Sequence, residues 1–330
     1  MRTFLCAAIL PLSSLMVAAQ TELAKPVSAE ALMIHEDGTF EPIWIISATK
    51  SQIRYQGSAV DTDSTDMMIS KAKSIYILEP KEFTKAIDLF QAHKYDEAKP
   101  KFAALKDRYK FMQAMPGNFS ALSAFYEMEC MRRLGDLEGL SAASQKFIKD
   151  PLQRENQAKQ VEAYVIWDAV RTKSWQRVDA LCKEWTADKE RTAGRLPNFI
   201  RAQIGYCHGL ALEGLKKPVA ALNAYNTAIT ADSGASEEIT RQAALNIMRI
   251  HKADPGVELA IKLWGTVDDN KTASGRARLL EASAMAAIYQ KFLSGGTPLP
   301  AEFKSLLRYK EEEDKGGDVK PEKDKEKDGK

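Results

Sequence analysis

The stretch LFQAHKYDEAKPKFAALKDRY, residues 89–109, contains the end of one amphipathic helix and the beginning of another. The first helix should end near His93. Residues three or four apart lie on the same side of a helix, so the second helix should have one apolar face: Tyr95, Ala98, Phe102 and Leu105. Two helices joined by so short a connection pack antiparallel, and the stretch therefore predicts a helical hairpin.

The same hairpin pattern recurs along the chain. The segments HKYDEA, GDLEGL, KSWQRV, KPVAAL and DPGVELA each follow one amphipathic helix and begin another. Their last residues are spaced by 42, 38, 43 and 39 positions: Ala98, Leu140, Val178, Ala221 and Ala260. An isolated hairpin cannot bury its apolar face, so neighbouring hairpins must stack. The sequence therefore predicts a mainly α fold, an α-solenoid of stacked helical hairpins over residues 80–309.

In some of these units, a small residue near the start of the second helix is followed one turn later by an aromatic residue. Two units show this well: Ala98–Phe102–Leu105 and Ala221–Tyr225–Ala228. The pattern resembles the tetratricopeptide repeat family, in which the small residue lets the two helices approach closely. That family has a period of 34 residues, so each unit here would carry extra residues. The resemblance implies a solenoid whose concave face binds extended or helical protein segments.

Residues 28–79 have a different period, and they precede the helices. Asp37-Gly38 is a strong signal for a hairpin turn, and about five short runs rich in Ile, Tyr and Trp read as strands. So short a set of strands can bury a core only by curling into a small barrel or by folding against a neighbour. The segment resembles the small SH3-like or Lsm-like β-domains that precede helical repeats in some exported bacterial proteins.

The first residues have the pattern of a secretory signal peptide. Arg2 is followed by a mostly apolar run over residues 4–17, and small residues lead up to Ala19 as at a cleavage site. We therefore expect residues 1–19 to be removed and the chain to be exported, to the periplasm or to the medium. An uncleaved anchor is the alternative. No later stretch is long and apolar enough to span a membrane.

The C-terminal residues 310–330 are dense in charges of both signs and almost free of apolar side chains. A segment of this composition cannot bury a core, so the sequence predicts a disordered charged tail. A solubilising tail and a tether to the cell wall or to a charged partner are both consistent with it.

The expected mature chain keeps three cysteines, Cys130, Cys182 and Cys207. An odd number and the lack of a CxxC pattern argue against a disulfide scaffold and against redox catalysis. Each cysteine lies in an apolar helical context, which favours buried thiols. Because an exported protein permits disulfides, a bond between Cys182 and Cys207 is the alternative.

The sequence contains no motif for catalysis or cofactor binding. It has no HExxH, no histidine pair at metal-ligand spacing, no GxSxG, and no GxGxxG or phosphate-loop signature. We therefore expect no catalytic residue, no cofactor and no metal, and we do not expect an enzyme. The net charge of +2 lacks the basic excess of a phosphate-tracking surface, so we expect no nucleic-acid partner.

The resemblance also implies which residues line the concave face, because the first helix of each pair forms it. These candidate groove residues are Phe125, Glu129, Arg132, Arg133, Trp167, Arg171, Gln203 and Tyr206. Aromatic residues and arginines are the types that form binding hot spots, and Arg132, Arg133 and Arg171 could hold a carboxylate through paired donors. The alternative is that the aromatic residues are ordinary packing between helices.

Three functions are consistent with these features. The first is an exported scaffold or adaptor that binds protein segments in the cell envelope. The second is a structural subunit of an envelope assembly, such as a pilus, secretion or outer-membrane complex, which would self-associate. The third is a glycan-binding protein that stacks sugars on Trp44, Tyr55 and Trp167, or an enzyme. The sequence favours the first.

Overall fold

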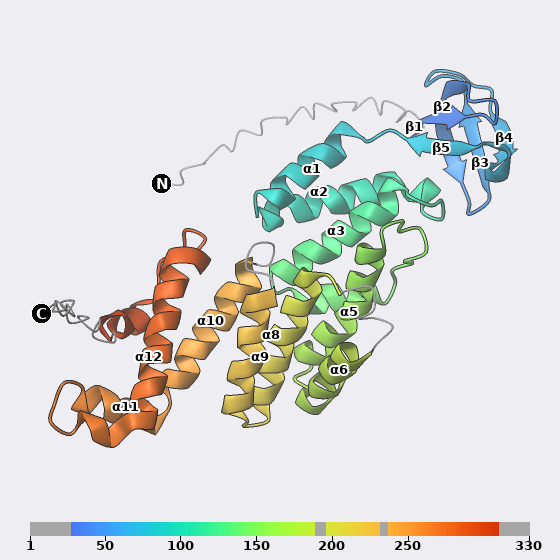
Figure 1. The fold of residues 1–330 in the computed structure, drawn as a ribbon. Coiled ribbons are helices and arrows are strands. Elements are labelled where there is room, and N and C mark those ends of the chain that lie inside the picture. The colour runs from blue at the N-terminus through green and yellow to red at the C-terminus, as the bar shows by residue number, and fades with distance from the viewer. Residues whose placement is uncertain (1–27, 189–195, 232–236, 310–330) are drawn as a thin grey trace, which may run out of the picture.

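The structure is a computed structural model that describes residues 28–188, 196–231 and 237–309 (Figure 1). The expected signal peptide and the expected charged tail lie outside the described residues. The described chain begins with a small antiparallel sheet and continues as helices, which confirms the mainly α class with a small β-domain in front.

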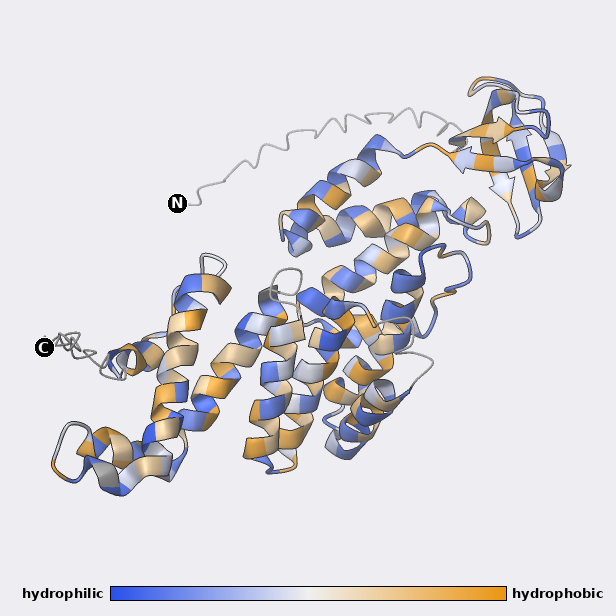
Figure 2. Cartoon of the chain, in the orientation of Figure 1, coloured by the Kyte–Doolittle hydropathy of each residue, from blue (hydrophilic) through white to orange (hydrophobic). Residues whose placement is uncertain are grey.

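No helix in the described part is long and apolar enough to cross a membrane. Hydrophobic and hydrophilic residues are mixed along the helices (Figure 2).

The sheet has five strands, in agreement with the number expected: β1 (Ala29–Ile34), β2 (Phe40–Ala48), β3 (Gln52–Gln56), β4 (Thr65–Met68) and β5 (Ser74–Ile77). Their order is β4-β3-β2-β1-β5, and all neighbours are antiparallel. The expected turn at Asp37-Gly38 joins β1 to β2, and Gly38 has a φ of 84°, which suits glycine. Among the described strands, β4 and β5 are edges of an open sheet.

The helices follow the sheet, and the hairpin expected over residues 89–109 is formed by the first two. Their bounds are α1 (Lys81–Gln91), α2 (Tyr95–Arg108), α3 (Phe119–Arg133), α4 (Leu137–Ser144), α5 (Glu155–Arg171), α6 (Trp175–Ala187), α8 (Asn198–Gly214), α9 (Pro218–Ala231), α10 (Glu237–Lys252), α11 (Pro255–Leu263) and α12 (Ala273–Ile288). The 3-10 helix η2 (Lys110–Met112) follows α2, and another 3-10 helix, η5 (Ala301–Arg308), is the last described element.

The same turn geometry joins the helices of four pairs, α1–α2, α3–α4, α5–α6 and α8–α9. Each turn has one residue with a positive φ. These residues are His93 (61°), Gly135 (73°), Lys173 (51°) and Lys216 (58°). The N–H of this residue donates to the carbonyl three residues earlier, and the next N–H donates to the carbonyl five residues before it. This is the Schellman motif that ends helices. The four residues are 42, 38 and 43 positions apart, the intervals found in the sequence.

The residue that marks each unit in the sequence belongs to the core. These residues are at most 2% exposed: Ala98, Leu140, Val178, Ala221 and Ala260. The pair α8–α9 also shows why small residues matter, because a Cβ on Gly205 would lie 2.8 Å from the backbone nitrogen of Ala228. The two helices can approach this closely only with glycine at that position.

The sheet and the first helices share one hydrophobic core. Met33 and Ile45, on the inner face of the sheet, belong to the same cluster of buried residues as Phe83 of α1 and Phe102 of α2. Strand β2 also contacts η2. The sheet therefore packs against η2 and shares a continuous apolar core with the first helical pair.

The described chain ends in a covering segment. A π-helical turn follows α12, and η5 begins directly after Pro300. Leu279 of α12 and Phe303 of η5 share a third cluster of buried residues with Met248 of α10. The short 3-10 helix after Pro300 thus packs against the last helices.

Candidate functional site

A buried ion pair lies between α3 and α5. Arg132 donates from Nε and Nη2 to the two carboxylate oxygens of Glu129, at 3.0 and 2.8 Å. Tyr164 of α5 donates to the same carboxylate at 2.8 Å. Burial alone would raise the pKa of Glu129, but the charges of Arg132 and Arg133 and these hydrogen bonds outweigh it, so the pKa lies below its usual value. Glu129 is therefore ionised inside the protein, where it depends on these partners.

Arg133 connects the end of α3 to the first hairpin. Its Nη1 donates to the Tyr95 hydroxyl at 2.9 Å, and its guanidinium carbon lies 5.3 Å from the ring centroids of both Phe90 and Tyr95. Glu238, at the start of α10, lies in the field of Arg132 and Arg133. Burial raises the pKa of Glu238, and these positive charges oppose the rise. The end of α3 is thus a point where the first hairpin and α10 converge.

A second group of contacts joins α3, α5 and α8. The guanidinium carbon of Arg132 lies 5.8 Å from the ring centroid of Trp167, and Trp167 Nε1 donates to Gln203 Oε1 at 2.8 Å. Gln203 and Gln160 exchange two hydrogen bonds, at 3.0 and 2.7 Å. The polar atoms of both amides are therefore paired, although the side chains are buried.

These contacts continue from α8 to α9 and α10. The rings of Trp167, Tyr206 and Tyr225 follow one another with centroids 6.2 and 6.0 Å apart. The Tyr225 hydroxyl and Arg249 of α10 each donate to Glu213 at 2.5 Å. These contacts join side chains of helices that are far apart in the sequence, and we call the set the inner network. Its members are Tyr95, Glu129, Arg132, Arg133, Gln160, Tyr164, Trp167, Gln203, Tyr206, Glu213, Tyr225 and Arg249.

The structure brings six of the eight predicted groove residues together in the inner network: Glu129, Arg132, Arg133, Trp167, Gln203 and Tyr206. Most of them do not line an open surface, because Glu129, Arg132, Trp167 and Gln203 are at most 7% exposed. This corrects their assignment to an exposed groove. The physical reason is that α5 contacts α8, and α8 contacts α10, on this side, so the face assigned to a ligand is filled by neighbouring helices.

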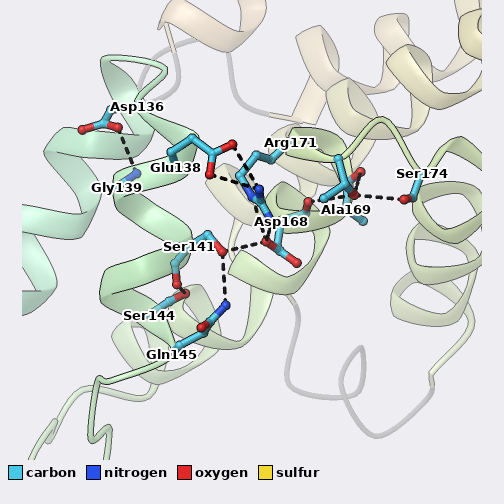
Figure 3. Close-up of polar contacts among 11 residues, drawn as sticks. Asp136, Glu138, Gly139, Ser141, Ser144, Gln145, Asp168, Ala169, Arg171 and Ser174 are labelled. Carbon is cyan, nitrogen blue, oxygen red and sulfur yellow. Dashed lines mark hydrogen bonds and ion pairs between the residues drawn. The ribbon is translucent and has the colours of Figure 1, made fainter.

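The other two predicted groove residues lie apart from the inner network. Phe125 is buried. Arg171 lies where α4 meets α5 (Figure 3) and donates to Glu138 at 3.0 Å and to Asp168 at 2.9 Å. Ser141 donates to the same Asp168 carboxylate at 2.7 Å. Arg171 therefore bridges two helices of the fold, and its donors are bound to Glu138 and Asp168.

The cysteines are free thiols in the structure. Cys130, Cys182 and Cys207 are all buried, and the disulfide considered between Cys182 and Cys207 is not formed. The Cys182 thiol instead faces the Ile204 carbonyl, with Sγ 3.7 Å from the oxygen. Burial raises the pKa of Cys182 to about 12, which keeps the thiol protonated and unreactive.

An open groove lies between α9 and α12, and we call it the α9–α12 groove. Its volume is about 950 Å³, and α10 lies between its walls. Ile247 and Ile250 of α10 contribute apolar side chains that are at most 9% exposed. The walls carry exposed or half-exposed residues of both helices: Val219, Leu222, Asn223 and Asn226 from α9, and Ala277, Glu281, Ala284 and Ile288 from α12.

Ion pairs neutralise most of the charge around this groove. Arg249 is held by Glu213, so the inner network ends at the groove. Arg278 of α12 pairs with Asp254, the residue that caps α11. The groove thus offers an apolar base and paired or neutral polar groups at its edges, which suits a largely apolar ligand surface.

Sequence reasoning missed the α9–α12 groove, because it assigned binding to the first helix of each pair. A signal was present at Val219, an apolar residue that α9 does not need for packing against α8 and that is 63% exposed. The distance between α9 and α12, however, depends on how two separate hairpins pack. No motif in either helix encodes it.

Comparison with known proteins adds no relative. No protein-family model matches the chain, and neither a curated protein nor a solved structure shows significant similarity to it.

Proposed function

We propose that this protein is an exported scaffold or adaptor with a tetratricopeptide-like α-solenoid, and that it binds a helical segment of a partner protein in the α9–α12 groove. The observation that carries the proposal is the groove of about 950 Å³, with an apolar base of α10 and helical walls on both sides. An amphipathic helix can lay its apolar face into such a groove, with anchors at positions i, i+3, i+4 and i+7.

Support for the tetratricopeptide-like part comes from the repeated turns and the buried marker residues. A shared turn at intervals of 42, 38 and 43 residues is what a chain of similar hairpins would require. Support for export comes from the signal-like residues 1–19.

Support for a protein ligand comes from the exposed apolar residues of the groove walls. Val219 on α9 and Ile288 on α12 are 63% and 39% exposed and line the same groove. Covering apolar surface contributes roughly 25 cal/mol per Å², so a partner that fills the groove gains from both walls at once. Asn223 and Asn226 can in addition donate and accept hydrogen bonds at the edge.

The proposal is tested by capture of a partner from native envelope extract with the expected mature chain, from residue 20 onwards. The test variant carries Val219→Asp and Ile288→Asp, because a charge on each wall opposes an apolar ligand. The matched control is Val267→Asp, at a residue that is 98% exposed and does not line the groove. Both variants should keep the helical content and thermal stability of the wild type.

We expect the wild type and the Val267→Asp control to retain the same partner, and the groove variant to retain it at least about tenfold less, as for the loss of a binding hot spot. A partner retained equally by all three proteins would place binding elsewhere and contradict the proposal. The alternative function, a structural subunit of an envelope assembly, is distinguished by the molecular mass of the purified chain in solution. That function requires stable self-association at micromolar concentration.

A further inference from the structure

The β-domain has a second, uncovered face. Alternate residues of a strand point to opposite sides, and the residues of β1, β2 and β5 that do not face the shared core form one outer face. The register sets Leu32 of β1 between Pro42 of β2 and Tyr76 of β5, and Ile34 opposite Phe40. Neighbours in a ladder are close enough to form a continuous surface. With Trp44, these residues define what we call the outer apolar face.

This face is exposed or half-exposed to solvent in the described structure: Phe40, Pro42 and Tyr76 are exposed, and Leu32, Ile34 and Trp44 are half-buried. Phe40 and Tyr76 are 71% and 61% exposed, and no residue of the face belongs to the buried clusters that join the sheet to the helices. The β-domain lies at the end of the molecule opposite to α11 and α12 (Figure 1). Strand β2 contacts η2, and its residues Ile43 and Ile45 belong to the core shared with the helices, whereas Phe40, Pro42 and Trp44 do not.

The composition of β1 is that of a strand with both faces covered. Ala31 and Met33 point into the core, and Leu32 and Ile34 point the other way, so the strand is hydrophobic along most of its length (Figure 2). Strands that are apolar on both faces are typical of sheets covered on both sides. Contiguous exposed apolar surface of this kind marks interaction sites.

The charges at this face are negative. Glu30 on β1 is exposed on this face, and Glu36, in the turn after β1, is exposed as well. The described side chains that point outwards from β1, β2 and β5 include no lysine or arginine. Arg54 on β3 is already bound to Asp66 by two hydrogen bonds of 2.8 Å. A complementary partner would therefore bring positive charge.

We propose that the outer apolar face binds a protein segment that combines apolar or aromatic side chains with lysine or arginine. The apolar side chains cover Leu32 and Ile34. The cationic group lies over the exposed ring of Phe40 or Tyr76, where cation–π attraction contributes about 0.5–1 kcal/mol or more, and within reach of Glu30 or Glu36. This site is independent of the α9–α12 groove, so one chain would hold two partner segments.

A random twelve-residue peptide library displayed on phage tests the proposal. It is selected on the expected mature chain, and the selected peptides are synthesised and titrated against purified variants with intrinsic tryptophan fluorescence as one signal and calorimetry as the other. The test variants are Phe40→Ser with Tyr76→Ser, and Glu30→Gln with Glu36→Gln. The matched control is Phe292→Ser, an equally exposed aromatic residue (68%) at the opposite end of the molecule.

The proposal requires selected peptides enriched in both apolar and basic residues, whose affinity falls at least tenfold in the aromatic variant, falls severalfold in the charge variant and is unchanged in Phe292→Ser. Three results would overturn it: no enrichment over several rounds, enriched peptides without basic residues, or equal binding to the wild type and the aromatic variant. A wild type that forms a dimer, with a monomeric aromatic variant, would show that a second copy covers the face and would also contradict it.

Discussion

Arg132 and Glu129 lie one helical turn apart, and each is stable in the interior only because the other is present. Their two hydrogen bonds, together with the one from Tyr164, satisfy a carboxylate that is 7% exposed. A buried pair of this kind adds little net stability, but loss of one partner leaves a charge unpaired in the interior. The inner network therefore holds α3, α5 and α8 in one arrangement, with its charged groups bound inside the protein.

Arg132→Leu should destabilise the protein by about 3–5 kcal/mol, because Glu129 would remain buried without its counter-charge. Lys262→Ala is the control: it removes an ion pair with Glu258 in which both side chains are 65% exposed, and it should change stability by less than about 0.5 kcal/mol. Urea unfolding followed by circular dichroism measures both. Similar small effects in the two variants would show that the inner network is not a structural element.

His251 should make stability depend on pH. Its side chain is 4% exposed, 3.6 Å from Glu281. Burial lowers its pKa, helped by Arg278 and opposed by Glu281 and Asp254. As pH falls, the imidazole is therefore protonated in the unfolded chain before it is protonated in the folded one. The contribution of neutral His251 to stability is present above about pH 6.5. It decreases as pH falls below that value, and the loss is complete when pH falls below the pKa of His251 in the folded state.

Urea unfolding at pH 7.5, 6.0 and 5.0 measures this effect against the variant His251→Gln. The wild type should lose more stability on acidification than the variant, by at most about 1.4 kcal/mol per pH unit for one proton. Equal pH dependence of the two proteins would contradict the assignment.

At the scale of elements, the recurring turn explains how unrelated segments form similar hairpins. A left-handed residue ends the first helix, and two hydrogen bonds fix the direction of the chain. Only one of the four positions has glycine, which adopts this conformation without strain. His93, Lys173 and Lys216 adopt it at a cost of about 1 kcal/mol each.

Lys216→Gly should therefore stabilise the protein by up to about 1 kcal/mol, and Gly135→Ala should destabilise it by a similar amount, because alanine is strained at a φ of 73°. Thermal unfolding of the two variants gives the sign directly. A destabilised Lys216→Gly protein would mean that the lysine side chain has a role that outweighs the strain.

Gly205→Ala should destabilise the protein, although alanine favours helices more than glycine does. The added methyl would lie 2.8 Å from the Ala228 nitrogen, so α8 and α9 would have to separate, at a cost of about 1–3 kcal/mol. Ser274→Ala on the exposed side of α12 is the control and should be close to neutral. A neutral Gly205→Ala variant would show that the close approach is not required.

Helices, turns and marker residues could be predicted because their signals are local. The apolar period and the turn segments lie within about forty residues, and Ala98 and Ala221 are buried as expected. The inner network could not be predicted, because Arg133 meets Tyr95 and Trp167 meets Gln203 across 38 and 36 positions. A change of one residue in register turns a helical face by about 100°. The α9–α12 groove depends on packing between hairpins, and the exposed apolar Val219 is its one local signal.

At the scale of the molecule, three clusters of buried residues follow one another along the chain. The first joins the sheet to α1 and α2, the second extends from α3 to α10, and the third joins α10 to α12 and η5. The α9–α12 groove lies where the second and third clusters meet, with α10 contributing to both. A groove at such a junction exposes apolar side chains without interrupting either core, which is why it is the site we propose for a partner.

Photo-crosslinking from within the groove measures this binding most directly. Benzoylphenylalanine replaces Asn223 on the groove wall in one protein and Val267, outside the groove, in another. After irradiation in native envelope extract, the Asn223 protein should form an adduct with a partner whose crosslinked peptide is an amphipathic helix, and the Val267 protein should not. Adducts from Val267 alone, or none from Asn223 with a partner that is still captured, would contradict binding in the α9–α12 groove.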